Sequence, residues 1–219
     1  MRFDEVGSFA QSVDALIQPP AASLVARYFD RTGPFAADTF DTVGVNDPLR
    51  IACDDLLAVT MLDVRVPPLA VRQLLCGEAD EISLLLADVP ASVPLWRATD
   101  AVLSNASKVW ELLRNHRGID WVTAGKLLAR KRPMLIPVYD SVIKGALRPS
   151  GSFWKALREA LNDEARRAMI DALRPPGLTA QVTMLRLLDV AVWMRRSEGT
   201  SARQVREDLG LEVLPRAGR

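Results

Sequence analysis

Apolar residues recur at three- and four-residue spacing along almost the whole chain, which is the pattern of α-helices with one buried face. Only residues 42–45 and 134–138 have any strand character. The spacing predicts helices at 21–29, 53–62, 67–75, 78–86, 106–113, 122–130, 141–147, 153–161, 164–173 and 179–194. We therefore expect an all-α fold of about ten helices.

The domain organisation follows from length and composition. A chain of 219 residues, 49% hydrophobic and 25% charged, is long enough to bury a sizeable core and is typical of a globular protein. We find no internal repeat, low-complexity tract or linker in the sequence. The sequence predicts one compact helical domain over residues 1–196, followed by a short amphipathic helix and a frayed tail over 197–219.

Charge is distributed unevenly along the chain. Residues 1–100 contain seven arginines, no lysine and 15 acidic residues, a net charge of −8, whereas residues 101–219 have a net charge of +9. This asymmetry indicates either a polyanion-binding face on the basic half or packing of the two halves on each other. It also allows self-association through the two halves. The overall pI of about 7.8 is below that of a dedicated nucleic-acid binder.

Localisation and metal content can be addressed from a few residues. The N-terminal stretch is acidic where a signal peptide would be basic, and no apolar run approaches the roughly 20 residues that span a bilayer. We therefore expect a soluble cytoplasmic protein without a membrane partner. Cys53, Cys76 and His116 are too few for a four-ligand zinc site, so neither a metal nor a cofactor is expected. Both cysteines are predicted to be reduced, buried thiols.

The segment from His116 to Pro133 carries the clearest candidate chemistry. Gly118 lies in a predicted tight turn before a helix, where backbone amides and the helix dipole favour a phosphate. Thr123, Lys126 and Arg130 are spaced to share one helix face and to contact that phosphate backbone. Two further candidates for nucleic-acid binding are the cationic helix end, completed by Lys131 and Arg132, and Trp121, which could stack on a base.

The same segment resembles the helix-hairpin-helix core of base-excision DNA glycosylases. Residues 118–124, Gly-Ile-Asp-Trp-Val-Thr-Ala, match that family's Gly-Val-Gly-x-x-Thr-Ala motif except at Asp120. By its spacing, Asp140 matches the aspartate that stabilises the cationic sugar in those enzymes. Val122 replaces the lysine of the lyase-competent members, and Val142 replaces a histidine. The resemblance implies a DNA-repair protein that binds DNA and is either a monofunctional N-glycosylase or an inactive relative.

Over nearly its whole length the chain is also similar to a bacterial family catalogued only as a domain of unknown function. The segments that carry the similarity are 27–30 together with 40–41, 54–62, 121–140, 152–154 and 185–195. The chain departs from this family chiefly at Asp120, where glycine is expected. The similarity implies a single compact helical protein with the hairpin at its centre, but no activity.

Several residues have a structural interpretation beside the functional one. Asp140 can cap the helix that begins at Ser141, and the pair Asp54-Asp55 is more typical of a helix cap than of acid/base catalysis. His116, the only histidine, is predicted to be exposed at a helix end. Asp189 is expected to pair with Arg186, with orientation of Lys126 or Arg132 as the alternative.

Two functions from different classes remain open. The leading hypothesis is the DNA-binding protein described above, with Asp140 as its catalytic residue. The alternative is a non-enzymatic interaction or structural protein in which the hairpin is only a packing motif.

Overall fold

The computed structural model describes residues 8–211, which form 13 α-helices and no strand. A π-helical turn (Gln73–Gly77) and a 3-10 turn (Leu95–Arg97) complete the helical content of this part of the chain. The α-helices are α1 (Phe9–Ile17), α2 (Ala21–Phe29), α3 (Thr39–Thr42), α4 (Cys53–Thr60), α5 (Pro68–Arg72), α6 (Ala79–Ala87), α7 (Asp100–Arg114), α8 (Trp121–Lys131), α9 (Ser141–Leu147), α10 (Phe153–Ala160), α11 (Glu164–Asp171), α12 (Met184–Arg196) and α13 (Thr200–Asp208). The predicted all-α class is confirmed.

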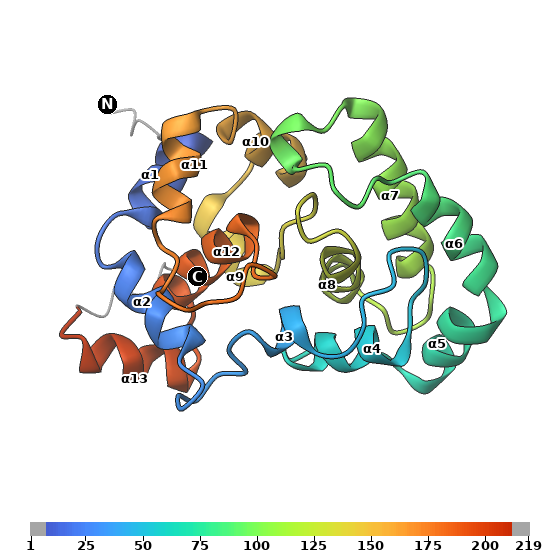
Figure 1. The fold of residues 1–219 in the computed structure, drawn as a ribbon, viewed down its shortest axis with the longest axis horizontal. Helices are drawn as coiled ribbons and strands as arrows, with labels where there is room; N and C mark the ends of the chain where they lie inside the picture. Colours follow the sequence, from blue (N-terminus) through green and yellow to red (C-terminus); the bar gives the residue numbers. More distant parts are fainter. Residues whose placement is uncertain (1–7, 212–219) are drawn as a thin grey trace, which may run out of the picture.

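The helices form two groups lying side by side (Figure 1). The first group contains α1, α2 and α9–α13, and α2 packs extensively on α12. The second contains α3–α8, with α8 at its centre against α4 and α7. The chain enters the second group after α2 and returns to the first after α8. Residues distant in sequence therefore meet where the two groups adjoin.

Helix α8 is the central helix, not the amphipathic surface helix that the sequence predicts. All nine residues from Thr123 to Lys131 are buried. Its apolar residues Ala124, Leu127 and Leu128 are fully enclosed, as expected, but the basic residues on its other faces are enclosed as well. The sequence pattern was misleading here because other elements, distant in sequence, cover the polar side of α8.

The predicted strand character is wrong at both places within the described residues. Residues 42–45 contain the end of α3 and a bend, and residues 134–138 form the connection between α8 and α9. Leu135, Ile136 and Val138 are nevertheless buried, because this connection passes through the interior. Pro133 precedes this segment and Pro137 lies within it, and proline cannot donate to a strand ladder.

The C-terminal helix α13 packs on α12 and α2. Ala202 and Val205 are buried, and the Arg206 guanidinium donates to the carbonyl oxygens of Met194 (2.6 Å) and Ser197 (2.8 Å). The predicted frayed tail corresponds mostly to residues 212–219, which lie outside the described residues. Between residues 8 and 211, no helix combines the length and apolar character required to span a membrane.

Candidate functional site

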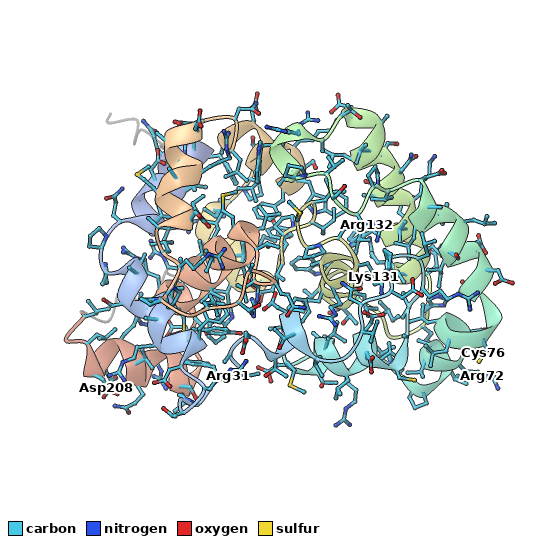
Figure 2. The ribbon with its side chains drawn as sticks, in the orientation of Figure 1. Arg31, Arg72, Cys76, Lys131, Arg132 and Asp208 are labelled. Carbon is cyan, nitrogen blue, oxygen red and sulfur yellow. The ribbon has the colours of Figure 1, made fainter. Side chains whose placement is uncertain are left out.

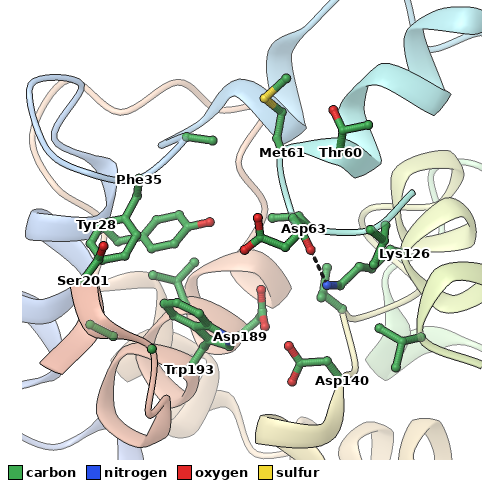
Figure 3. A pocket seen from close by; sticks show the side chains of 18 of the residues that line it. Tyr28, Phe35, Thr60, Met61, Asp63, Lys126, Asp140, Asp189, Trp193 and Ser201 are labelled. Atoms are coloured by element: carbon green, nitrogen blue, oxygen red, sulfur yellow. Dashed lines mark hydrogen bonds between the residues drawn. The ribbon is translucent and has the colours of Figure 1, made fainter. Parts of the chain in front are cut away.

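A cavity of about 730 Å³ lies where the two groups of helices adjoin. It is lined by residues from α2, α8, α12 and α13, from the loop after α4, and from the start of α9 (Figure 3). Because these elements are widely separated along the chain, the cavity exists only in the folded protein. Its size is within the range of pockets that hold small molecules, about 300–1,000 Å³.

One wall of the cavity is aromatic. Tyr28 on α2 stacks on Phe35 with ring centroids 5.1 Å apart, and Trp193 on α12 meets both rings edge to face at 6.3 and 6.0 Å. Tyr28 is buried, whereas Phe35 and Trp193 are half-buried and line the cavity. Such a wall can accommodate a planar ring by stacking.

Asp140 lies on the opposite side of the cavity and caps α9. Its Oδ1 accepts hydrogen bonds from the amides of Val142 (2.9 Å) and Ile143 (3.0 Å). The structure gives Oδ2 no hydrogen-bond donor among the described residues, and the carboxylate lines the cavity. The structural interpretation of Asp140 as a helix cap is therefore confirmed, and the cap leaves one oxygen of this cavity-lining residue without a hydrogen-bond donor among the described residues.

Lys126 reaches the same space from α8, where it is only 7% exposed. Its Nζ donates to the carbonyl oxygen of Leu62 at 2.6 Å, which ties α8 to the loop after α4. Burial lowers the pKa of Lys126, and the negative charges of Asp140 and Asp189 oppose that shift. Figure 3 shows Lys126, Asp140 and Asp189 directed toward a common region.

A buried charged network forms the floor beneath the aromatic wall. The Arg186 guanidinium donates to Asp189 and to the Tyr28 hydroxyl (2.7 Å), and its Nε lies 3.5 Å from Oδ2 of Asp41. The predicted Arg186–Asp189 pair is confirmed. Burial raises the pKa of Asp189 to about 7 and that of Asp41 to about 6, although Arg186 opposes both shifts.

The cavity lining carries more acidic than basic groups. Its carboxyl groups belong to Asp63, Asp120, Asp140 and Asp189, and its cationic groups to Lys126 and Arg186. An acidic lining beside an aromatic wall favours a planar ligand that is positively charged or electron-poor. Between residues 8 and 211, no three His, Cys, Asp or Glu side chains are grouped so that they could hold a metal ion.

The cationic end of α8 does not face solvent. Arg130, Lys131 and Arg132 are between 1 and 3% exposed. Figure 2 shows Lys131 and Arg132 in the interior of the second group of helices. Arg130 donates to the carbonyl oxygens of Phe40, Asp41 and Val43, and Arg132 to those of Leu86, Pro48, Val89 and Lys131. Lys131 pairs with the fully buried Asp55 at 2.8 Å.

These contacts correct the predicted role of the cationic cluster. Most donors of Arg130, Lys131 and Arg132 are used within the protein, and the remaining Arg130 Nε is buried 3.5 Å from Oδ1 of Asp55, so none is available to a phosphate in this structure. The predicted face of Thr123, Lys126 and Arg130 is likewise enclosed, since all three are at most 7% exposed. What the cluster does instead is hold the basic half against the acidic half, as one interpretation of the charge asymmetry predicts.

The hairpin turn has the predicted conformation, but Pro67 packs against Gly118 and Asp120 accepts from an amide at the start of α8. Gly118 has φ of +86°, and a Cβ added there would meet Cγ of Pro67 at 2.6 Å. Asp120 caps α8 by accepting from the Thr123 amide at 2.7 Å. Partial burial raises the pKa of Asp120, but the hydrogen bonds from Thr123 outweigh it and lower the pKa overall. This carboxylate therefore uses a backbone amide at the start of α8, where the sequence predicts a phosphate.

Other sequence-based expectations are also corrected. Trp121 does not reach the main cavity but lines a separate pocket between α7 and α10. The His116 side chain is only 8% exposed, with Nε2 3.4 Å from Glu78. Cys53 and Cys76 are exposed, since they lie at the start of α4 and in the π-helical turn rather than on core faces. Asp55 caps α4 through the Ala52 amide, as the helix-cap interpretation predicts.

Tyr28, Phe35 and Trp193 were not identified from the sequence as site residues. Tyr28 and Trp193 do fall within segments 27–30 and 185–195, which carry the similarity to the family of unknown function. The similarity in these two segments could have pointed to Tyr28 and Trp193 as site residues. Aromatic residues at helical spacing are, however, usually core residues.

Comparisons with known proteins give a family but no activity. No curated protein and no solved structure matches the chain. A family model described as "Family of unknown function (DUF6308)" matches residues 21–196, which include α2 to α12 and most of the cavity lining. The chain therefore belongs to the DUF6308 family.

Proposed function

We propose that the protein is a DNA N-glycosylase without lyase activity, and that the cavity between the two groups of helices receives the target base. The observation that carries this proposal is the carboxylate of Asp140, a residue that lines an aromatic-walled cavity: Oδ1 is fixed by two backbone amides, and Oδ2 has no hydrogen-bond donor among the described residues. The glycosylase-like hairpin in the sequence supports the same class of substrate.

The proposed reaction needs a base removed from the DNA stack. The base would stack against Phe35 and Trp193, and its sugar would lie beside Asp140. As the C–N bond breaks, its electron pair leaves with the base, and Asp140 stabilises the positive charge that develops on the sugar. Water then adds to C1′ and gives up a proton, for which the carboxylate of Asp140 is the acceptor.

The cavity lining favours a particular kind of base. A cationic, alkylated base would gain from the aromatic wall and from the excess of carboxyl groups. Its positive charge also makes it a good leaving group, since it departs neutral. We therefore expect alkylated purines to be released faster than oxidised or deaminated bases.

Lyase chemistry is not part of the proposal. Val122 occupies the position of the reactive lysine in the resembled enzymes. It lines the cavity, but its side chain has no amine that could form a Schiff base. Lys126 lies one helical turn further on, but its Nζ is engaged by the Leu62 carbonyl. Borohydride should therefore trap no covalent adduct with abasic DNA, and a trapped adduct that Lys126→Met abolishes would contradict this assignment.

The testing experiment compares two aspartates that make the same type of cap. Asp163 accepts from the amides of Ala165 and Arg166 at the start of α11, and it does not line the cavity. Asp140→Asn should abolish base release from alkylated duplex DNA, whereas Asp163→Asn should leave it unchanged. Both variants should fold, because asparagine also caps helices.

The result of this experiment distinguishes a catalytic role of Asp140 from a purely structural one. If the wild type releases no base from duplexes carrying alkylated, oxidised or deaminated bases, the glycosylase proposal is wrong. If it releases bases and Asp140→Asn does so equally well, Asp140 is only a helix cap.

A second candidate function is a non-enzymatic protein in which the hairpin is a packing motif. The contact of Gly118 with Pro67, the cap by Asp120 and the enclosed cationic cluster favour it. Salt-dependent binding to duplex DNA distinguishes the two candidates, because phosphate contacts weaken as salt rises. Wild-type protein without DNA affinity at low salt would favour the packing motif.

A further inference from the structure

A second pocket, of about 410 Å³, lies on another side of α8, between α7, α9 and α10. Its walls are unusually aromatic. They consist of Trp110, Trp121, Tyr139, Phe153 and Trp154. Tyr139 and Phe153 stack with centroids 4.0 Å apart, and Trp121 meets Tyr139 edge to face at 5.4 Å. This pocket does not share a lining residue with the cavity beside Asp140.

The polar groups of the second pocket are mostly donors. Arg114 lies over the Trp110 ring at 4.7 Å and Lys144 over the Trp121 ring at 5.4 Å, so both cations are held at the rim. No lining residue is acidic. The Trp121 and Trp154 indole N–H groups have no hydrogen-bond acceptor among the described residues. An electron-rich or anionic group therefore has donors to meet at this site.

Gly125 keeps the pocket open at its base. It is buried on α8, yet a Cβ added there would come no closer than 3.9 Å to Trp110 Nε1 and 4.0 Å to the Tyr139 carbonyl oxygen. A larger side chain at this position would therefore extend into the pocket.

We propose that this second pocket binds a small molecule with a planar aromatic ring and an anionic group. The ring is held by the aromatic walls, and the anionic group is bound by Lys144 and Arg114. The aromatic side chains supply stacking surface, and the charge of the rim selects anions over cations. Aromatic carboxylates and nucleoside monophosphates share this chemistry. The proposal is independent of any glycosylase activity.

Isothermal titration calorimetry gives a direct assay. We would titrate the full chain with indole-3-acetate and, separately, with adenosine monophosphate. Saturable binding of the first alone would identify an aromatic carboxylate site, and of the second alone a nucleotide site. Tryptamine, a planar aromatic cation, should bind more weakly than either.

Variants localise the binding. Lys144→Ala combined with Arg114→Ala should weaken binding roughly tenfold or more, because both anion contacts are lost. Arg167→Ala is the matched control, since Arg167 makes the same type of contact over Trp96 at 5.4 Å outside the pocket. Gly125→Val should abolish binding by filling the pocket, and circular dichroism will show whether that variant folds.

Three results would overturn the proposal. The first is absence of saturable binding of both anionic probes into the millimolar range. The second is equal affinity of the wild type and the doubly substituted Lys144/Arg114 variant, whose exposed positions should not disturb folding. The third is binding of tryptamine as tight as that of the anions.

Discussion

Replacing Arg132 by methionine tests whether the cationic end of α8 is structural. Arg132 is 1% exposed and has no carboxylate partner among the described residues. Its guanidinium instead donates to the carbonyl oxygens of Val89 (2.6 Å), Pro48 (2.7 Å), Lys131 (2.8 Å) and Leu86 (2.5 Å). Methionine would fill most of the space of the side-chain stem but would leave these oxygens without that donor.

The expected cost follows from those four hydrogen bonds. Each hydrogen bond to a charged group contributes about 1.5–3 kcal/mol, but the contributions are not additive and desolvation of the guanidinium offsets part of them. The Leu86 carbonyl also keeps its bond from the Val89 amide. We expect Arg132→Met to lower the free energy of unfolding by about 3–5 kcal/mol.

Urea denaturation followed by circular dichroism measures this loss. The matched control is Arg203→Met on α13, an exposed arginine whose removal should change stability by about 0.5 kcal/mol at most. A loss below about 1 kcal/mol for Arg132→Met, with an unchanged denaturant slope, would show that the guanidinium is not enclosed. The cationic end of α8 would then again be available for phosphate contacts.

Three further predictions concern the hairpin and the buried carboxyl groups. Asp120→Gly removes the cap on Thr123 and should cost about 1 kcal/mol in urea denaturation; a gain in DNA affinity in a filter-binding assay would show that the hairpin contacts phosphate. Gly118→Ala should cost more than about 1 kcal/mol because of its positive φ and its contact with Pro67, and an unchanged melting temperature would contradict that contact. Burial raises the pKa of Asp189 from its ordinary value of 3.8 to about 7 in the folded protein, so the unfolded chain binds fewer protons between these two pH values. The contribution of Asp189 to the free energy of unfolding is therefore fully present at low pH and is lost as pH rises through about 7. Asp189→Asn should reduce this loss of stability when urea midpoints are compared at about pH 5 and about pH 8.

The helices themselves were largely predictable from the sequence. The predicted ranges 21–29 and 141–147 agree with α2 and α9, because capping and apolar spacing act within a few residues. Helix α1 was missed, and α12 was predicted to begin too early. These errors fall where Pro-, Gly- or Ser-containing segments precede the helices.

What the sequence did not show was which polar side chains are enclosed. Arg130 and Arg132 bind carbonyl oxygens between 43 and 90 positions earlier in the chain, apart from the bond of Arg132 to Lys131. Local periodicity carries no information about such distant partners, so basic residues at a helix end are predicted as exposed. Of the candidate site, Asp140, Lys126 and the Arg186–Asp189 pair were identified from the sequence, because local spacing singles them out. The aromatic wall of the site depends on the packing of α2 against α12.

The two interpretations of Asp140 reinforce each other. Two backbone amides hold Oδ1, so the carboxylate of this cavity-lining residue cannot rotate freely and Oδ2 has a fixed position. A catalytic carboxylate benefits from such a fixed orientation, because no reorganisation is needed when charge develops on the substrate. Capping alone requires neither a cavity in front of the second oxygen nor an aromatic wall across from it. The cavity, assembled from elements far apart in sequence, is therefore the stronger reason to test Asp140 for chemistry, and the cap is the means by which its carboxylate is positioned.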